Sequence, residues 1–210
     1  MPRPRALPLW LPVLLLASLW WWAPRLAPLL PASAQRRAIV VLADDPLRTE
    51  AALDLWAREP QSQFWILGGP YLLLASWDQL DQRGIAVEDP RLGTLMQGED
   101  TVGQLILLSE RLPRQVRHVT LVTDRSHSRR SLLIARLALG RRGIHVDVPP
   151  DAELPARMPP ENPLRRWRDG LRVQLWRASG WDGRSLGLWL QQLVPNAGPS
   201  PQPPSHTDRR

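Results

Sequence analysis

The sequence predicts an α/β fold in which helices cover both faces of a mostly parallel sheet. Short uninterrupted apolar runs alternate with longer stretches of helical periodicity, a pattern typical of strands buried on both faces. Several runs end at Asp, Thr or Gly, where a strand would turn into the next helix. The 210 residues suffice for one domain with a substantial core and additional segments at both ends.

The predicted strands are short and apolar. Residues 38–43, "AIVVLA", form the first, and "QFWIL" within "QFWILGGP" forms the second. "GIAVE", residues 84–88, is a weaker candidate, followed by "HVTLVT" at 118–123 and "IHVDV" at 144–148. No run is long enough for a helix, and turn residues bound most of them, which favours strands.

Helices are predicted between these strands. They cover residues 47–58, 77–83, 99–112 and 126–139, and end near Arg58, Gly84, Pro113 and Gly140. A basic amphipathic helix follows in residues 161–181, with apolar positions at Leu164, Trp167, Leu171 and Trp176.

Residues 1–37 are predicted to be a signal peptide or a membrane anchor. Arg3 and Arg5 precede an uncharged stretch from residue 6 to residue 24, and "PASAQ" offers a small-x-small cleavage site ending at Ala34. The stretch is also about as long as a short membrane span. Both readings stay open, so we expect a plasma-membrane protein, or export to the periplasm if the segment is cleaved. The early arginines indicate that the N-terminus stays inside.

The remaining domain boundaries are predicted from changes in composition along the chain. Residues 38–150 form the α/β domain, and residues 151–194 a C-terminal helical extension after a proline-rich connection. Residues 195–210, rich in Pro and polar residues, are predicted to be a disordered tail.

Charge and composition restrict the classes of partner that the protein is expected to bind. The net charge is +7, and all 27 basic residues are arginine. This favours an anionic small molecule or a membrane surface. No nucleic-acid-binding motif is present, so no nucleic acid is expected. The sequence has no Cys, which excludes disulfides and thiolate metal sites. It shows no P-loop, no His-rich metal cluster and no Gly-x-Ser-x-Gly motif. No metal is predicted, and the cofactor is unknown.

The stretch "LVTDRSHSRR", residues 121–130, contains the strongest candidate site. Helical spacing places His127 and Arg130 on the same face as Ile134 and Leu137, the face expected to pack on the sheet. With a helix N-terminus beside them, they form a candidate anion or phosphate site. His127 could also transfer a proton.

Structural roles for the same residues are equally open. Ser126 could cap the helix, His127 could bond to a neighbouring loop, and Arg130 could pair with Asp44 or Asp124. Asp44 and Asp45 are typical of a solvated turn, because a metal would need more oxygen ligands. Gly68 and Gly69 permit close backbone approach to a ligand, or a plain turn.

Four motifs occur in the order found in a known family. "AIVVLA…R", "ILGG", "EDTVGQ" and "LVTDRSHSRR" resemble the YdcF-like family of bacterial envelope proteins, which includes SanA and ElyC. The resemblance covers residues 38–148. It implies a Rossmann-like three-layer sandwich with a mostly parallel sheet, preceded by a membrane segment. The family is associated with cell-envelope biogenesis, and one member with S-adenosylmethionine binding.

The resemblance also implies a pocket. Its motifs fall on residues that would bind a ligand or transfer a proton: Arg48, Gly68, Gly69, Thr101, Thr123, His127 and Arg130. Several positions depart from the family pattern. Ala43 replaces a Gly, Asp100 an Asn, Gly103 a Glu, Gln104 an Asn, and Ser126 a Tyr. The lost Glu removes a candidate acid/base, a role that would pass to Asp100.

Three functions are therefore expected as alternatives. The first is a membrane-associated YdcF-like domain that binds an anionic or nucleotide-like small molecule and serves envelope biogenesis or maintenance. The second is a hydrolase or transferase acting on a phosphate-bearing envelope precursor, with His127 as general acid/base and Asp100 as its carboxylate partner. The third is a non-catalytic membrane scaffold held by its basic C-terminal helix. Whether any reaction is catalysed stays open.

Overall fold

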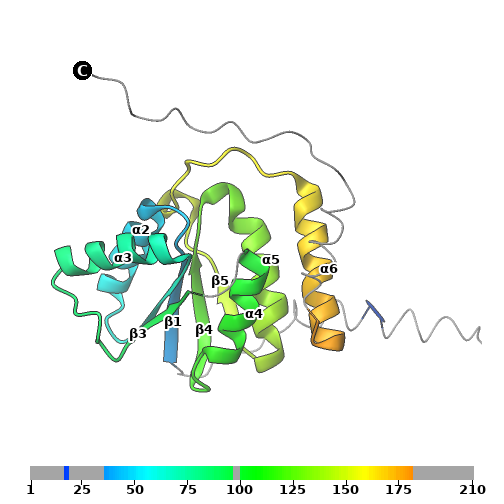
Figure 1. The fold of residues 1–210 in the computed structure, drawn as a ribbon. Coiled ribbons are helices and arrows are strands. Elements are labelled where there is room, and N and C mark those ends of the chain that lie inside the picture. The colour runs from blue at the N-terminus through cyan, green and yellow to red at the C-terminus, as the bar shows by residue number, and fades with distance from the viewer. Residues whose placement is uncertain (1–16, 19–35, 97–99, 182–210) are drawn as a thin grey trace, which may run out of the picture.

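A five-stranded parallel sheet forms the centre of the protein (Figure 1). The computed structural model describes residues 17–18, 36–96 and 100–181. The strands lie in the order β3-β2-β1-β4-β5. Their bounds are β1 (Arg36–Leu42), β2 (Gln63–Leu67), β3 (Leu92–Leu95), β4 (Val116–Val122) and β5 (His145–Asp147). The α/β fold with a parallel sheet is confirmed, and it is consistent with a Rossmann-like sandwich.

Helices connect successive strands and cover the sheet. They are α2 (Pro46–Arg58), α3 (Pro70–Gln82), α4 (Thr101–Arg111), α5 (Ser128–Leu139) and α6 (Pro163–Ser179). Short 3₁₀ turns occur at η2 (Arg125–His127), η3 (Gly140–Arg142) and η4 (Asp151–Glu153). Each helix between two strands returns the chain to the edge where the next parallel strand begins.

The core has two halves because side chains on a strand alternate between the two faces. On β1, Ala38, Val40 and Leu42 join a cluster with α4 and α5, whereas Ile39 and Val41 join a cluster with α2 and α3. These five side chains are at most 1% exposed. The uninterrupted apolar runs in the sequence therefore reflect burial on both faces.

One predicted element was wrong, and a second was predicted too short. Residues 84–88 contain no strand, and β3 lies later, at Leu92–Leu95. Gly84 has a φ of 68° and closes the turn that ends α3, and residues 85–91 contain turns but no strand. The helix expected at 77–83 begins much earlier, at Pro70. The extended Gly69 and the proline at the first helical position start it there.

The helix predicted from Ser126 begins later than expected. Residues Arg125–His127 form the 3₁₀ turn η2, and α5 starts at Ser128. His127 is consequently the residue that precedes α5, where its backbone already has a helical conformation. Its side chain therefore need not continue the stripe that Ile134 and Leu137 form in the core.

Helix α6 packs alongside α5, as Figure 1 shows in orange and green. Its inner face buries Val173 and packs Trp176 against the core. Leu164, Trp167 and Leu171, three of the apolar positions predicted for this helix, are 60% exposed or more. The apolar residues of α6 thus lie on two faces, and only one of them packs on the domain.

Both ends of the chain lie largely outside the described residues. This applies to the predicted signal or anchor segment up to residue 35, and to residues 182–210, which include the predicted tail. The start at Glu99 of the helix predicted for residues 99–112 also falls outside them. Within the described part of the chain, no helix is long and apolar enough to cross a membrane.

Candidate functional site

The strand order places the candidate site between β1 and β4. These two strands are neighbours, yet their connections lead to opposite halves of the core. In open parallel sheets, ligands bind beyond the carboxyl ends of the strands at such a switch in order. The predicted residues Arg48 and Thr123 both follow this edge, one after β1 and the other after β4.

Arg48 is a buried cation. It is 2% exposed, and its guanidinium donates to the carbonyl oxygen of Leu42 at 3.3 Å and to the Asp44 carboxylate at 3.0 Å. Its Nε has no hydrogen-bond partner among the described residues. A buried guanidinium with an unused donor is costly unless something accepts from it. Arg48 can therefore bind an anion or acceptor at the end of β1.

Thr123 and Asp124 follow β4, and they differ in how far their hydrogen-bonding groups have partners. The Thr123 hydroxyl is buried and finds no hydrogen-bond partner in the described part of the chain. The Asp124 carboxylate accepts from the backbone and hydroxyl of Ser126 and from the backbone amides of Arg157 and Met158. Asp124 thus holds the C-terminal connection in place, whereas Thr123 has hydrogen-bonding capacity left.

The acidity of Asp124 agrees with that structural role. Burial opposes its charged form, but the hydrogen bonds from Ser126, Arg157 and Met158 outweigh it and lower the pKa of Asp124 to about 2. The carboxylate is therefore charged at neutral pH and is not a candidate acid.

His127 and Arg130 meet at a carboxylate from the C-terminal connection. Oε1 of Glu161 lies 2.9 Å from Nδ1 of His127 and 2.7 Å from Nε of Arg130. These are ion-pair distances without the alignment of hydrogen bonds. Arg130 also donates to Asp169 of α6 at 2.9 Å. The predicted pair is thus brought together, but its partners are Glu161 and Asp169 rather than Asp44 or Asp124.

Asp100 has partners other than the predicted one. The Asp100 carboxylate caps α4 by accepting from the amide of Gly103 at 2.8 Å, and it pairs with Arg172 of α6 at 2.5 Å. Burial opposes its charged form, yet the Gly103 amide and Arg172 lower the pKa of Asp100 overall. Thr101 is half-buried at the start of α4. The carboxylate beside His127 is Glu161, which corrects the expected pairing of His127 with Asp100.

Gly68 and Gly69 follow β2 and have unequal surroundings. A Cβ on Gly68 would lie 3.3 Å from the carbonyl oxygen of Ala43, whereas one on Gly69 would meet nothing within 4 Å. Gly68 therefore allows close packing of β2 against the end of β1. Gly69 faces open space that a ligand could enter.

A shallow pocket of about 410 Å³ lies beside the His127–Glu161 contact. Asp124, Ser126 and Glu161 line it, together with Arg125 and Arg129. Helix N-termini are anion-binding positions, but here Asp45 and Asp124 already accept from the first amides of α2 and η2. An anion can bind in this arrangement if it displaces one of the chain's own carboxylates.

Sequence reasoning missed Glu161 and Asp169. They are the only acidic residues in the otherwise basic segment from residue 157 to residue 181. This isolation could have marked them as residues with a specific role. Asp169 is 1% exposed, and a buried carboxylate requires a cationic partner. What the sequence could not show is that α6 packs beside α5, where Arg130 is available.

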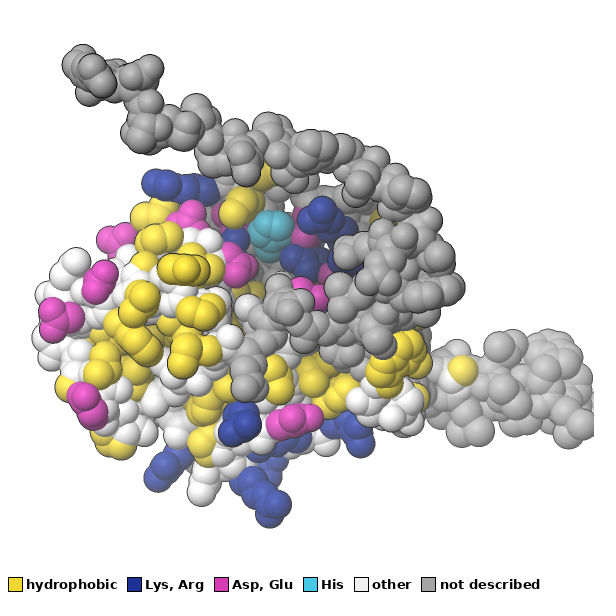
Figure 2. All heavy atoms as spheres, viewed as in Figure 1, with side chains coloured by type: hydrophobic (Ala, Val, Ile, Leu, Met, Phe, Trp, Pro, Cys, Tyr) yellow, Lys and Arg dark blue, Asp and Glu magenta, His cyan; other side chains and the backbone are white. Residues whose placement is uncertain are grey.

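A larger hollow lies at the opposite edge of the sheet, where the strands begin. It has a volume of about 820 Å³ and is lined by Arg36, Arg37, Arg58 and Arg91, with Glu59 as the acidic member. Figure 2 shows dark blue side chains gathered at this lower end of the molecule. The hollow was not predicted, because its arginines come from three separate parts of the chain: the start of β1, the end of α2 and the turn before β3.

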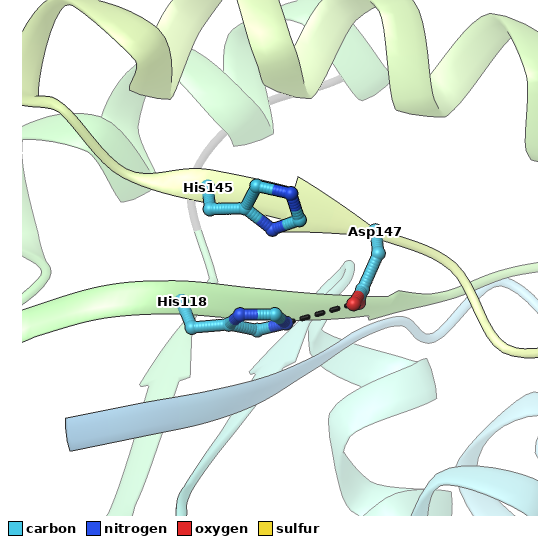
Figure 3. A group of neighbouring side chains, drawn as sticks. All are labelled: His118, His145 and Asp147. Atoms are coloured by element: carbon cyan, nitrogen blue, oxygen red, sulfur yellow. Dashed lines mark hydrogen bonds and ion pairs between the residues drawn. The ribbon is translucent and has the colours of Figure 1, made fainter. Parts of the chain in front are cut away.

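The structure also gathers two histidines and an aspartate that the sequence keeps apart. His118 on β4 lies beside His145 and Asp147 on β5, in an arrangement that can bind a metal ion (Figure 3). The sequence shows no His-rich motif here, because His118 and His145 become neighbours only through strand pairing.

Comparison of the chain with protein-family models, curated proteins and solved structures finds no match. The YdcF-like resemblance therefore stays a prediction that is based on the four motifs in the sequence.

Proposed function

We propose that this protein binds an anionic small molecule, such as a phosphate-bearing or nucleotide-like compound, at the carboxyl edge of its sheet. The observation that carries the proposal is the contact of Glu161 with His127 and Arg130. A carboxylate of the chain fills the position in which a ligand's anionic group would lie, between an imidazole and a guanidinium.

The contact is suited to replacement of the Glu161 carboxylate by the anionic group of a ligand. Glu161 approaches both partners at ion-pair distance, but without hydrogen-bond alignment. It comes from the proline-rich connection before α6 rather than from a helix or strand. A phosphate offers more acceptor oxygens than the carboxylate, so it can align with both cationic donors at once. Arg130 keeps Asp169 as a second partner, which holds its side chain in place during the exchange.

We propose that the site extends towards β1. Arg48, with an unused donor, lies in α2 just after β1, and Thr123, with an unused hydroxyl, follows the neighbouring strand β4. Gly69 leaves space after β2. A ligand longer than phosphate, with a second polar group, would use this extension. That length favours a nucleotide-like compound over a simple inorganic anion.

We further propose that the domain sits at a membrane through the edge where its strands begin. Arg36, the first residue of β1, is separated by eleven residues from the uncharged N-terminal stretch that ends at residue 24. Exposed Arg114 precedes β4 and exposed Arg141, in η3, precedes β5, so this edge carries basic residues in addition to the arginine-lined hollow. Lipid phosphates are complementary to such a surface. The carboxyl edge with His127 would then face away from the membrane, and this arrangement accords with the envelope role that the resemblance implies.

The binding proposal is tested by calorimetry of the full chain with inorganic phosphate, pyrophosphate and ADP. Glu161→Gln should tighten binding of these probes about tenfold because the competing charge is removed. Arg130→Ala should weaken it by about tenfold or more. Glu153→Gln is the matched control, since Glu153 is another glutamate of the same connection and pairs with Arg58. Binding that is equal in Glu161→Gln, Arg130→Ala and the parent protein would overturn the proposal.

A further inference from the structure

The side chains of His118, His145 and Asp147 converge on one face of the sheet, near its β5 edge (Figure 3). His118 and His145 are register partners on the parallel strands β4 and β5. Asp147 lies two residues after His145, so alternation along the strand brings both to the same face. The intervening Val146 packs in the cluster that contains α5, so the three polar side chains point to the other face.

The distances are those of a preformed cluster. Nε2 of His118 lies 2.8 Å from Oδ2 of Asp147, and the two imidazole rings are 4.8 Å apart between centroids, tilted by 36°. One ligand atom from each residue lies within 4.8 Å of the other two. Tetrahedral ligands of zinc are about 3.3 Å apart, given metal–ligand distances near 2.0 Å. The widest of these separations therefore has to shorten when an ion binds.

Two atoms of the cluster are left unsatisfied. Nδ1 of His145 and Oδ1 of Asp147 are buried and have no hydrogen-bond partner within the part of the chain that the structure describes. Buried polar atoms without partners are rare, and each calls for an explanation such as a bound ion or water. An ion bound among the three side chains would satisfy both.

We propose that His118, His145 and Asp147 form a site for a divalent transition-metal ion, with zinc as the best fit. Two imidazoles and a carboxylate are ligands that zinc accepts, and three protein ligands leave a fourth position for water. The Asp147 side chain is 40% exposed, so solvent and the ion can reach the site. The ion would replace the proton that His118 shares with Asp147.

The surroundings shift the pKa values of His145 and Asp147. Burial and the neighbouring His118 lower the pKa of His145. Burial opposes ionisation of Asp147, but hydrogen bonds with His118 and Thr120 and the charge of His118 lower the pKa of this carboxyl overall. The two cations near this cluster already interact with other groups. Arg37 is paired with Glu59 at 3.3 Å, and Arg136 donates its Nε to the carbonyl of Val146.

This site is separate from the anion site. His118 lies in the first half of β4 and faces away from α5, whereas His127 and Arg130 follow the carboxyl end of β4, in η2 and α5. The metal proposal therefore does not depend on the proposed function, and each can fail without the other.

The test is titration of the full, metal-free chain with zinc alone, with cobalt as a spectroscopic probe. We expect one ion per chain, cobalt absorption typical of nitrogen and oxygen ligands, and a higher unfolding temperature with zinc. His145→Ala should weaken binding about 100-fold. Asp147→Asn, which keeps the shape of the side chain, should also weaken it and serves if His145→Ala fails to fold.

The controls are the chain's other two histidines, varied as His127→Ala and His206→Ala, which should bind zinc like the parent protein. Absence of stoichiometric binding would overturn the proposal. Binding that survives His145→Ala and Asp147→Asn, or that is lost in either control variant, would do the same.

Discussion

The Glu161 carboxylate lies 2.7 Å from the Arg130 guanidinium and joins the C-terminal connection to the first turn of α5. The same arginine holds Asp169 of α6 on its other side. One side chain thus binds two acidic residues that follow the last strand. It ties α6 to the sheet domain and at the same time marks the position of the candidate anion site.

The first prediction concerns the stability that this arginine provides. Asp169 is 2% exposed at its side chain and Arg130 is 15% exposed. Arg130→Ala and Asp169→Ala should each destabilise the protein by about 3 kcal/mol, because each leaves the partner buried with less compensation. Together they should cost less than the sum. Urea unfolding of the four proteins measures this coupling.

A matched control is the ion pair of Arg83 with Asp54, which has a similar distance of 2.7 Å but is exposed at 33% and 64%. Its coupling should stay below about 1 kcal/mol. Equal coupling in the two pairs would show that burial of Asp169 does not matter.

The second prediction concerns acid stability. The pKa of Asp124 is lowered from 3.8 to about 2 by its hydrogen bonds. A carboxyl whose pKa is depressed by folding stabilises the protein above its unfolded pKa, and this contribution is lost as pH falls towards the folded pKa. Stability should therefore decline between about pH 4 and pH 2. Asp124→Asn should cost about 2 kcal/mol at pH 7 and flatten that decline. Thermal unfolding of both proteins across this pH range measures the decline. An equally steep loss of stability in Asp124→Asn would show that Asp124 is not its source.

The third prediction separates the two glycines after β2. Gly68→Ala should destabilise by about 1 kcal/mol, because the new methyl group lies 3.3 Å from the rigid carbonyl of Ala43. Gly69→Ser should change stability by less than about 0.5 kcal/mol, since serine also suits the position before a helix, and its Cβ meets nothing within 4 Å. The serine should still weaken ADP binding by filling open space. Calorimetry with ADP and urea unfolding together distinguish the two effects.

The fourth prediction asks what the buried Arg48 does. Arg48→Met fills similar space without a charge, and replacing a buried ion by an apolar residue is often neutral or stabilising. Because Nε has no described partner, we expect stability within about 1 kcal/mol of the parent and phosphate binding weaker by about tenfold. A large loss of stability with unchanged binding would instead show that Arg48 holds the end of β1 through Leu42 and Asp44.

The fifth prediction concerns the basic edge. Charge reversal of the exposed Arg114 and Arg141 to Glu should reduce binding of the full chain to vesicles that contain phosphatidylglycerol. It should leave binding to neutral vesicles unchanged, because only the electrostatic attraction is altered. The matched control reverses Arg129 and Arg165, which are also exposed but lie in the first turns of α5 and α6. Equal losses in the two double variants, measured by flotation at low and high salt, would argue against a membrane-facing edge.

The sequence by itself determined the architecture and the local candidates. Apolar runs such as residues 38–43 and 118–123 are strands because they are buried on both faces, and that burial leaves a direct trace in composition. The stretch with His127 and Arg130 could be found because both follow a strand within a few residues. The strand expected at 84–88 failed because a short apolar segment beside Gly84 also suits a turn.

Only the tertiary structure decided which residues meet. The partner of His127 is Glu161 rather than Asp100 because the chain returns over the sheet after β5. His118 and His145 form a cluster because parallel pairing aligns them. Periodicity within one segment reports which face a side chain occupies, but it contains no information on which segment lies opposite. That depends on strand order and helix packing, which are set by the whole core at once.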